Sequence, residues 1–193
     1  MSQGIHLIVG LGNPGQQYAG TRHNAGAWLV QSLHDCYAKL PLKLEKKFKA
    51  EIVRTHLHGH EIFLAIPTTF MNLSGEAVAA IAKFYKIPTE AILIAHDELD
   101  VPCGEIRLKQ GGGHGGHNGL RSICQHLQSH DFYRLRIGIG HPGQSHLVTD
   151  YVLHKPNQDD RQLIETAINK GVDALPLILN DDLQKAMTQL HTT

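Results

Sequence analysis

The chain of 193 residues has few cysteines, few aromatic residues and no net charge. Its three cysteines, Cys36, Cys103 and Cys124, are widely spaced and form no CxxC pair, which argues against both a disulfide framework and a thiolate metal site. Eighteen basic residues balance eighteen acidic ones, so a nucleic acid would have to be held by a local patch. No apolar run approaches bilayer length, and the start, MSQGIHLIVG, lacks the basic residues of a signal peptide. We therefore expect a cytoplasmic protein without a membrane partner.

Short apolar runs of β character alternate along the chain with segments of helical spacing. Strands are expected at 5–10, 91–99, 105–110 and 133–140, a hairpin at 49–67, helices at 25–40, 75–86 and 119–128, and two more helices in the C-terminal third. This order predicts an α/β fold in which residues 1–193 form a single domain. Its three layers are α/β/α, with a central mixed β-sheet flanked by helices on both faces.

Polar residues near the expected helix starts indicate N-caps. Asn72 or Ser74 would cap the helix 75–86, and Asn118 would cap the helix 119–128. Asp181 and Gln184 have the spacing of a capping box for the last helix.

The first expected strand is followed by GLGNPG, residues 10–15, which matches the G-x-G-x-x-G pattern of dinucleotide-binding folds. Two features argue against that interpretation. Pro14 interrupts the place where a helix should begin, and Asp35 lies within a predicted helix rather than at the end of a second strand, where a ribose-binding acid belongs.

The loops after the expected strands share carboxamides and one acid next to a histidine. In open α/β sheets ligands bind at the carboxyl ends of the strands, so these loops should meet. Asparagine offers two donors and one acceptor without charge, which suits a peptide-like group, and a carboxylate paired with an imidazole can form a general base. Taken singly, each residue could equally be a turn or cap residue. The residues are Asn13, His23, Asn24, Asn72, His96, Asp97, Glu98, His117 and Asn118.

The stretch GGGHGGHNG, residues 111–119, allows three readings: a metal site, a phosphate cradle and a hinge. His114 and His117 are three residues apart, but no cysteine or acid accompanies them, so a metal site is disfavoured. The G-K-[ST] ending of a phosphate-binding loop is missing. The glycines suit a hinge, since they permit positive φ.

Four segments, LIVGLGNPGQQYAGTRHNAG, PTTFMNLSG, HDELDVPCGEIRLKQGGGHGGHNGLRS and RLRIGIGHPG, together resemble the bacterial peptidyl-tRNA hydrolase family over almost the whole chain. The resemblance implies an esterase that cleaves the bond between a peptide and the 3′ ribose of tRNA and so recycles tRNA. It also implies a monomer that needs no cofactor and no metal. The partner would be peptidyl-tRNA, contacted at its acceptor end and its peptide.

Carried over by motif, the resemblance assigns His23 as the catalytic base and Asp97 as the residue that orients it. The other expected contacts fall into two groups. Asn13, Tyr18, Met71, Asn72, His117 and Asn118 would bind substrate, and Arg107, Lys109 and Arg136 would clamp the tRNA 5′ phosphate. Which asparagine stabilises the oxyanion is left open.

Two alternatives from other classes remain at this point. A non-catalytic RNA-binding protein could use the same fold, although the intact His23, Asp97 and asparagine set disfavours it. A metal-dependent amidohydrolase could exploit the fifteen histidines.

Overall fold

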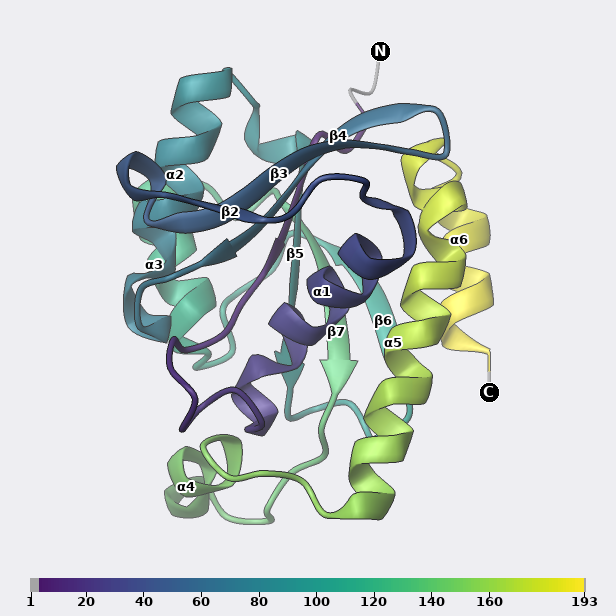
Figure 1. The fold of residues 1–193 in the computed structure, drawn as a ribbon. Helices are drawn as coiled ribbons and strands as arrows, with labels where there is room; N and C mark the ends of the chain where they lie inside the picture. Colours follow the sequence, from purple (N-terminus) through teal and green to yellow (C-terminus); the bar gives the residue numbers. More distant parts are fainter. Residues whose placement is uncertain (1–3, 193) are drawn as a thin grey trace.

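The structure is a computed structural model that describes residues 4–192. Within this range, seven strands form one sheet in the order β2-β3-β4-β1-β5-β7-β6 (Figure 1). The strands are β1 (Leu7–Gly10), β2 (Lys43–Glu45), β3 (Ala50–Leu57), β4 (His60–Pro67), β5 (Ile92–Glu98), β6 (Ile106–Gln110) and β7 (Tyr133–Gly138). The central strands β4, β1, β5 and β7 are parallel, and β2, β3 and β6 pair antiparallel at the two edges.

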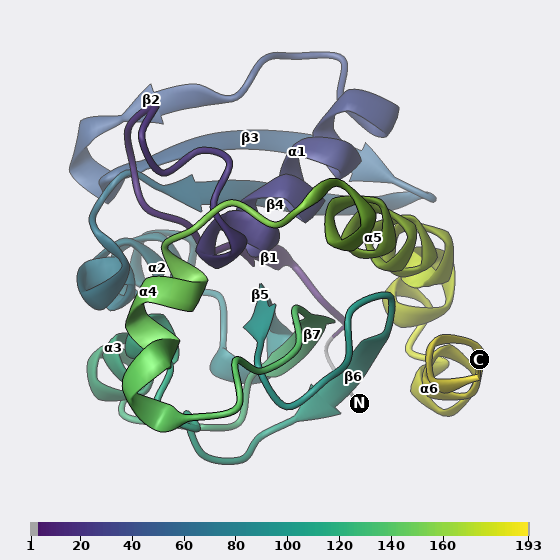
Figure 2. The ribbon, with the colours of Figure 1, turned by 90° about the horizontal axis from the view of Figure 1, so that it is seen from below.

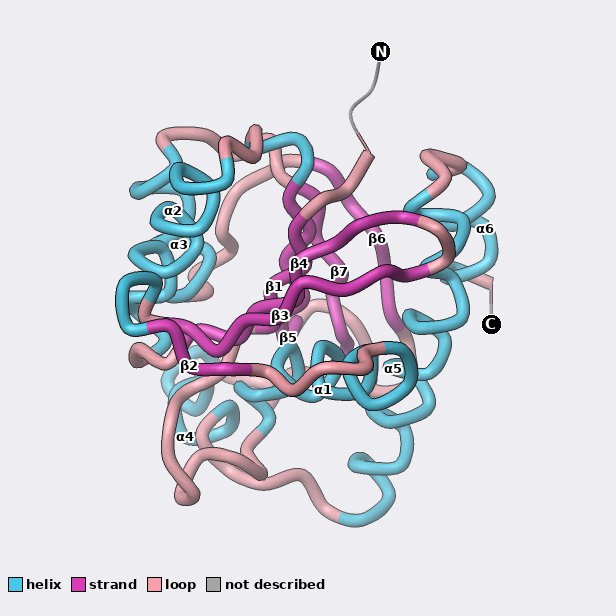
Figure 3. The backbone as a smooth tube through the Cα atoms, turned by 45° about the horizontal axis from the view of Figure 1, so that its top comes forward, coloured by secondary structure: helices cyan, strands magenta, loops and turns pink. Residues whose placement is uncertain are grey.

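Helices cover both faces of the sheet (Figures 2 and 3). One face carries α1 (Ala25–Tyr37), α5 (Gln158–Leu179) and α6 (Leu183–His191), and the other carries α2 (Ser74–Tyr85) and α3 (Asn118–Leu127). A short helix, α4 (Val148–Val152), lies beyond the carboxyl ends of β5 and β7 (Figure 1). The predicted three-layer α/β/α fold with a mixed sheet is confirmed. No helix within residues 4–192 is both long and apolar enough to cross a bilayer.

The apolar strand β1 explains how one sheet supports two cores. All four of its residues are buried, and successive side chains point to opposite faces because the side-chain period of a strand is two. Ile8 belongs to the core beneath α1 and α5, whereas Leu7 and Val9 belong to the core beneath α2 and α3. A strand buried on both faces appears in the sequence as a continuous apolar run.

The N-cap predictions are wrong. Leu73 occupies the N-cap of α2 without a side-chain bond, while Ser74 lies inside the helix and its hydroxyl donates to the Met71 carbonyl. His117, not Asn118, caps α3.

The capping box expected in the last helix also does not form. The N-cap of α6 is Asp182, which makes no side-chain cap bond, and the preceding Asp181 adopts a left-handed conformation with φ of 62°. Two short elements, β2 and α4, were not predicted from the sequence.

Candidate active site

A cleft of about 670 Å³ opens at the carboxyl ends of the parallel strands. The segments that line it include the loop after β1, the turn after β4, the end of β5, the start of α3 and helix α4. All eight residues expected to be catalytic or to bind the substrate directly lie in its lining: Asn13, Tyr18, His23, Met71, Asn72, Asp97, His117 and Asn118. The convergence of polar loops expected at this edge of the sheet is therefore present.

Close packing of α1 against the strand ends brings His23 to this cleft. His23 lies in the 3-10 turn Arg22–Asn24 that leads into α1. A Cβ on Gly26 would lie 2.1 Å from the Ala95 carbonyl oxygen, so only glycine lets the helix start this close to β5. Arg22 fixes the turn from the other side, since its guanidinium donates to the Tyr151 carbonyl and lies 3.9 Å from the Tyr151 ring centroid.

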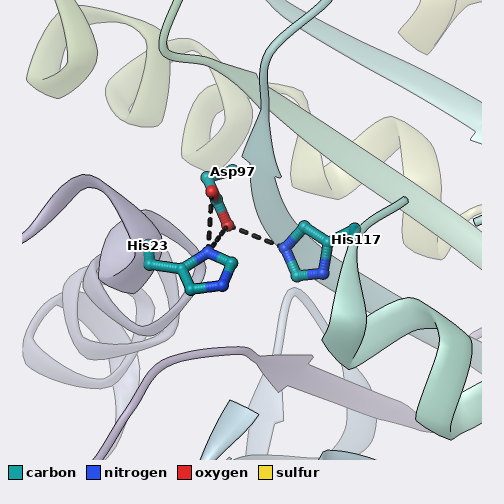
Figure 4. A group of neighbouring side chains, drawn as sticks. All are labelled: His23, Asp97 and His117. Atoms are coloured by element: carbon teal, nitrogen blue, oxygen red, sulfur yellow. Dashed lines mark hydrogen bonds and ion pairs between the residues drawn. The ribbon is translucent and has the colours of Figure 1, made fainter. Parts of the chain in front are cut away.

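His23, Asp97 and His117 form a hydrogen-bonded chain (Figure 4). His23 Nδ1 lies 2.9 Å from Asp97 Oδ2 and 3.0 Å from Oδ1, and His117 Nε2 lies 2.8 Å from Oδ1. The Asp97 side chain is only 2% exposed. A carboxylate can only accept, so His23 carries its proton on Nδ1 and leaves the Nε2 lone pair free to act as a base.

The start of α3 fixes the tautomer of His117. Its Nδ1 accepts hydrogen bonds from the backbone N–H groups of Gly119 and Leu120, at 3.1 and 3.4 Å. Nδ1 is therefore unprotonated, and Nε2 carries the proton that it donates to Asp97. The helix N-terminus thereby holds His117 as a donor to the carboxylate.

The surroundings of Asp97 in this group of three side chains favour its ionised form. Burial alone would raise the pKa of Asp97, but the charges and hydrogen bonds of His23 and His117 outweigh it and hold the pKa well below the ordinary range. Burial alone would lower the pKa of His23, but the attraction of Asp97 and the hydrogen bond to it raise the pKa above 6.5. A positioned imidazole with an unprotonated ring nitrogen suits general-base catalysis.

The same three residues also have the composition of a metal site. One donor atom from each of His23, Asp97 and His117 lies within 4.8 Å of the others. Ligation by His117 Nε2 would move its proton to Nδ1, where it would face the N–H groups of Gly119 and Leu120 and break the cap. The tautomer imposed by α3 therefore opposes metal binding at this position.

Asn13 is held with one end of its carboxamide free. Its Oδ1 accepts from the Met71 N–H at 2.7 Å. Asn24 fixes its backbone, since Asn24 Oδ1 accepts from the Asn13 N–H at 2.9 Å and Asn24 Nδ2 donates to the Asn13 carbonyl at 3.0 Å. The Asn13 side-chain N–H₂ has no partner within residues 4–192 and remains a donor for a ligand.

The remaining expected binding residues lie around the rim. Tyr18 contacts the exposed Phe70 edge to face, with the ring centroids 6.2 Å apart. Asn72 and Asn118 are exposed, and Asn118 Oδ1 accepts from Arg121 at 3.3 Å. These contacts leave polar side chains accessible to a substrate in the cleft.

The three basic residues of the expected phosphate clamp lie on β6 and β7, outside the lining of the cleft. Arg107 and Arg136 are cross-strand partners. Lys109 is exposed two pairs further along, opposite Arg134. Arg136 donates to Glu98 at 2.8 Å, and Glu98 itself lines the cleft. The structure therefore brings these cations together beside the site.

Comparisons with known proteins decide the family. The sequence model of a family described as peptidyl-tRNA hydrolase matches residues 7–193. A peptidyl-tRNA hydrolase of Coxiella burnetii is 56% identical over 192 residues, 100% of both chains, and one of Haemophilus influenzae is 53% identical over 189 residues, 97% of both. The chain belongs to the peptidyl-tRNA hydrolase family. The crystal structure of peptidyl-tRNA hydrolase from Acinetobacter baumannii, 50% identical, matches 96% of this chain and 94% of its own with a TM-score of 0.93.

This member of the peptidyl-tRNA hydrolase family also has cleft residues that the sequence reasoning did not single out. Helix α4 and the residues after it contribute an apolar wall of Val148, Val152 and Leu153. The sequence indicated Asn24 only as one of the loop carboxamides, whereas in the structure its side chain holds the backbone of Asn13. The apolar pair at positions 148 and 152 has helical spacing, which is the signal that could have revealed α4.

Proposed function

We propose that the chain hydrolyses the ester bond between an N-acylated aminoacyl group and the 3′ ribose of tRNA, with His23 as general base for an attacking water. The observation that carries this proposal is the His23–Asp97 pair, because it leaves the lone pair of Nε2 free in the cleft. An ester is activated compared with an amide. A positioned base and one water are therefore sufficient, and no covalent nucleophile is required.

Asp97 and His117 act through His23. As His23 takes the proton from water it becomes an imidazolium, which the ionised Asp97 stabilises across 2.9 Å. His117 donates to the same carboxylate and keeps it aligned. After the ester carbonyl is attacked, the tetrahedral intermediate collapses, and the ribose oxygen leaves with a proton returned from His23.

The free N–H₂ of Asn13 is the best-prepared donor for the oxyanion. Three hydrogen bonds to Asn24 and Met71 fix this residue before substrate arrives, so little reorganisation is needed as charge develops. Asn72 and Asn118 are then left to bond the N-acyl peptide unit. A free aminoacyl-tRNA would leave these carboxamides partly unpaired, and its ammonium group would lose hydration, so it should be a poor substrate.

On the RNA side, Lys109 and Arg136 contact the 5′ phosphate, with Arg107 beside them. Phosphate contacts position a nucleic acid without reading its sequence, which favours acceptance of many tRNAs. A non-catalytic RNA-binding protein would have no use for a buried His–Asp pair that leaves an imidazole nitrogen free in a cleft. The catalytic function is therefore the better supported of the two.

The test is the release of N-acetylated amino acid from charged tRNA, compared with the release from unacetylated aminoacyl-tRNA. Wild-type protein should cleave the acetylated substrate much faster than the unacetylated one, and His23→Ala should cleave the acetylated substrate at least about 10²-fold more slowly than wild type. Equal cleavage of both substrates would contradict the proposed selectivity. Binding of tRNA without hydrolysis would favour the RNA-binding alternative.

We also propose that the protein acts as a monomer in the cytoplasm. In support, a single chain brings together all eight residues expected to be catalytic or to bind the substrate, and the substrate is a tRNA. Light scattering on a size-exclusion column should give a mass near the 21.3 kDa of one chain, and twice that mass would contradict the proposal.

A further inference from the structure

One buried cation, Arg134 on β7, has no part in the mechanism above. It is 3% exposed, and within residues 4–192 no carboxylate forms an ion pair with it. Its Nε also has no hydrogen-bond partner among these residues. Burying a guanidinium without a counter-charge is costly, so the contacts that it does make are informative.

Both terminal nitrogens of Arg134 bind the glycine-rich loop between β6 and α3. The path of the backbone from β6 to α3 can be followed in Figure 2. Nη1 donates to the Gly113 carbonyl, and Nη2 donates to the Gly112 carbonyl at 2.6 Å. The guanidinium carbon lies 4.5 Å from the centroid of the Phe132 ring, which supports the group from the strand side. The planar fork of arginine thus fixes two successive carbonyls at once.

The loop has little else to hold it in place. The loop contains five glycines, which supply no side chains for packing. Four of them have positive φ: Gly111, Gly112, Gly115 and Gly116. Before the pinned carbonyls, the Gly111 N–H donates at 3.1 Å to the carbonyl of Phe132, the residue that precedes β7. A segment with this composition has high conformational entropy unless its polar groups are fixed.

A single turn connects the pinned carbonyls to the active site. The turn begins at His114, directly after Gly113, and closes with a hydrogen bond of 2.9 Å from the His117 N–H to the His114 carbonyl. The His114 side chain tightens it by accepting from the Gly116 N–H at 3.0 Å. The turn therefore links Gly113 to His117, which the start of α3 holds from its other side.

We propose that Arg134 is a positioning residue for hydrolysis: it anchors the carbonyls of Gly112 and Gly113 so that the turn 114–117 places His117 Nε2 against Asp97. This inference rests on the proposed function of the His23–Asp97–His117 chain. The neighbouring Lys109 cannot replace Arg134. It is exposed, and a single ammonium lacks the fork that binds two carbonyls.

The test is a double-mutant cycle on kcat. Arg134→Ala and Arg134→Lys should each lower kcat by about 10-fold to 100-fold, the usual cost of a displaced active-site group. In a His117→Ala background the same substitutions should change kcat by less than about twofold, because the residue they position is already missing. Arg134→Lys keeps a buried cation and serves as the second variant if the alanine variant folds poorly.

Leu135→Ala is the matched control, since Leu135 is the next residue on β7 and is 1% exposed. It should lower thermal stability with little change in kcat. Guanidinium chloride at about 10 mM is far below the concentrations that unfold proteins. It should restore part of the kcat of Arg134→Ala and leave the kcat of Leu135→Ala unchanged. An equal loss of kcat from Arg134→Ala in the wild-type and His117→Ala backgrounds would overturn the proposal. A His117→Ala variant with wild-type kcat would instead contradict the role proposed for the hydrogen-bonded residues His23, Asp97 and His117.

Discussion

Replacing Asp97 by asparagine removes one charge and one acceptor from a point where two N–H groups converge. His117 cannot change tautomer, since its Nδ1 caps α3, so the new amide must turn its oxygen toward His117. The amide N–H₂ then faces His23 Nδ1 from the position of Oδ2, 2.9 Å away. His23 is forced to carry its proton on Nε2, the nitrogen that should act as the base.

The size of the effect follows from two losses. The hydrogen bond from His23 to a charged acceptor is worth about 1.5–3 kcal/mol, and the enforced tautomer change costs a similar amount. Together they correspond to a fall in kcat of about 10²-fold to 10⁴-fold. The KM should change little, because Asp97 is 3% exposed and has little surface to offer a substrate.

The assay for Asp97→Asn is single-turnover hydrolysis of N-acetylated aminoacyl-tRNA, with Asp173→Asn on α5 as a control for loss of a carboxylate elsewhere. Nitrogen chemical shifts of the imidazole should report a proton on Nδ1 of His23 in the wild type and on Nε2 in Asp97→Asn. A variant that keeps both the wild-type kcat and the wild-type tautomer would refute the reasoning.

The remaining predictions concern the base, the RNA contacts and metal dependence. His23→Ala should lower kcat by about 10²-fold to 10⁴-fold, and turnover near the wild-type rate would remove the general-base mechanism. Lys109→Ala and Arg136→Ala should raise KM and each reduce the slope of log KM against log salt concentration by about one; an unchanged slope would exclude the phosphate clamp. Hydrolysis should persist in EDTA, since His117 offers a proton rather than a lone pair to the central carboxylate, and loss of activity reversed by added zinc would favour the metal-dependent alternative.

Much of the fold could be predicted because its strands follow one of two patterns, a continuous apolar run or an alternation of apolar and polar residues. The residues of β1 and β5 are buried on both faces, and the segments around His58 and Gly59 alternate as a hairpin should. In contrast, all three residues of β2 are exposed, and α4 has only five residues. The strand β2 has no buried residue to form a pattern, and α4 offers a single apolar pair at helical spacing, Val148 and Val152.

The candidate site likewise has a part that could be predicted from the sequence and a part that could not. The rule that loops meet at the carboxyl ends of parallel strands was enough to group Asn13, His23, Asn72 and Asp97. The cap of α3 could not be read from the sequence, because the preference for Asn at N-caps pointed to Asn118 and gave no reason to choose an imidazole. The hydrogen bonds that connect His117 through Asp97 to His23 depend on the conformation of the glycine-rich loop before α3. Several glycines of this loop have positive φ angles, which a pattern of residue types does not specify. Whether that loop also acts as a hinge stays a prediction.

The central claim is that neutral His23, held by Asp97, is the base. Its most direct test compares two pH titrations, one of the His23 imidazole in the free protein by NMR and one of kcat/KM for N-acetylated aminoacyl-tRNA. Because Asp97 raises the pKa of His23 and only the neutral imidazole accepts a proton, kcat/KM should fall as the pH drops through that pKa. The account predicts that both titrations share one midpoint above 6.5. A kinetic midpoint that differs from that of His23, or a kcat/KM that does not fall toward acid pH, would contradict it.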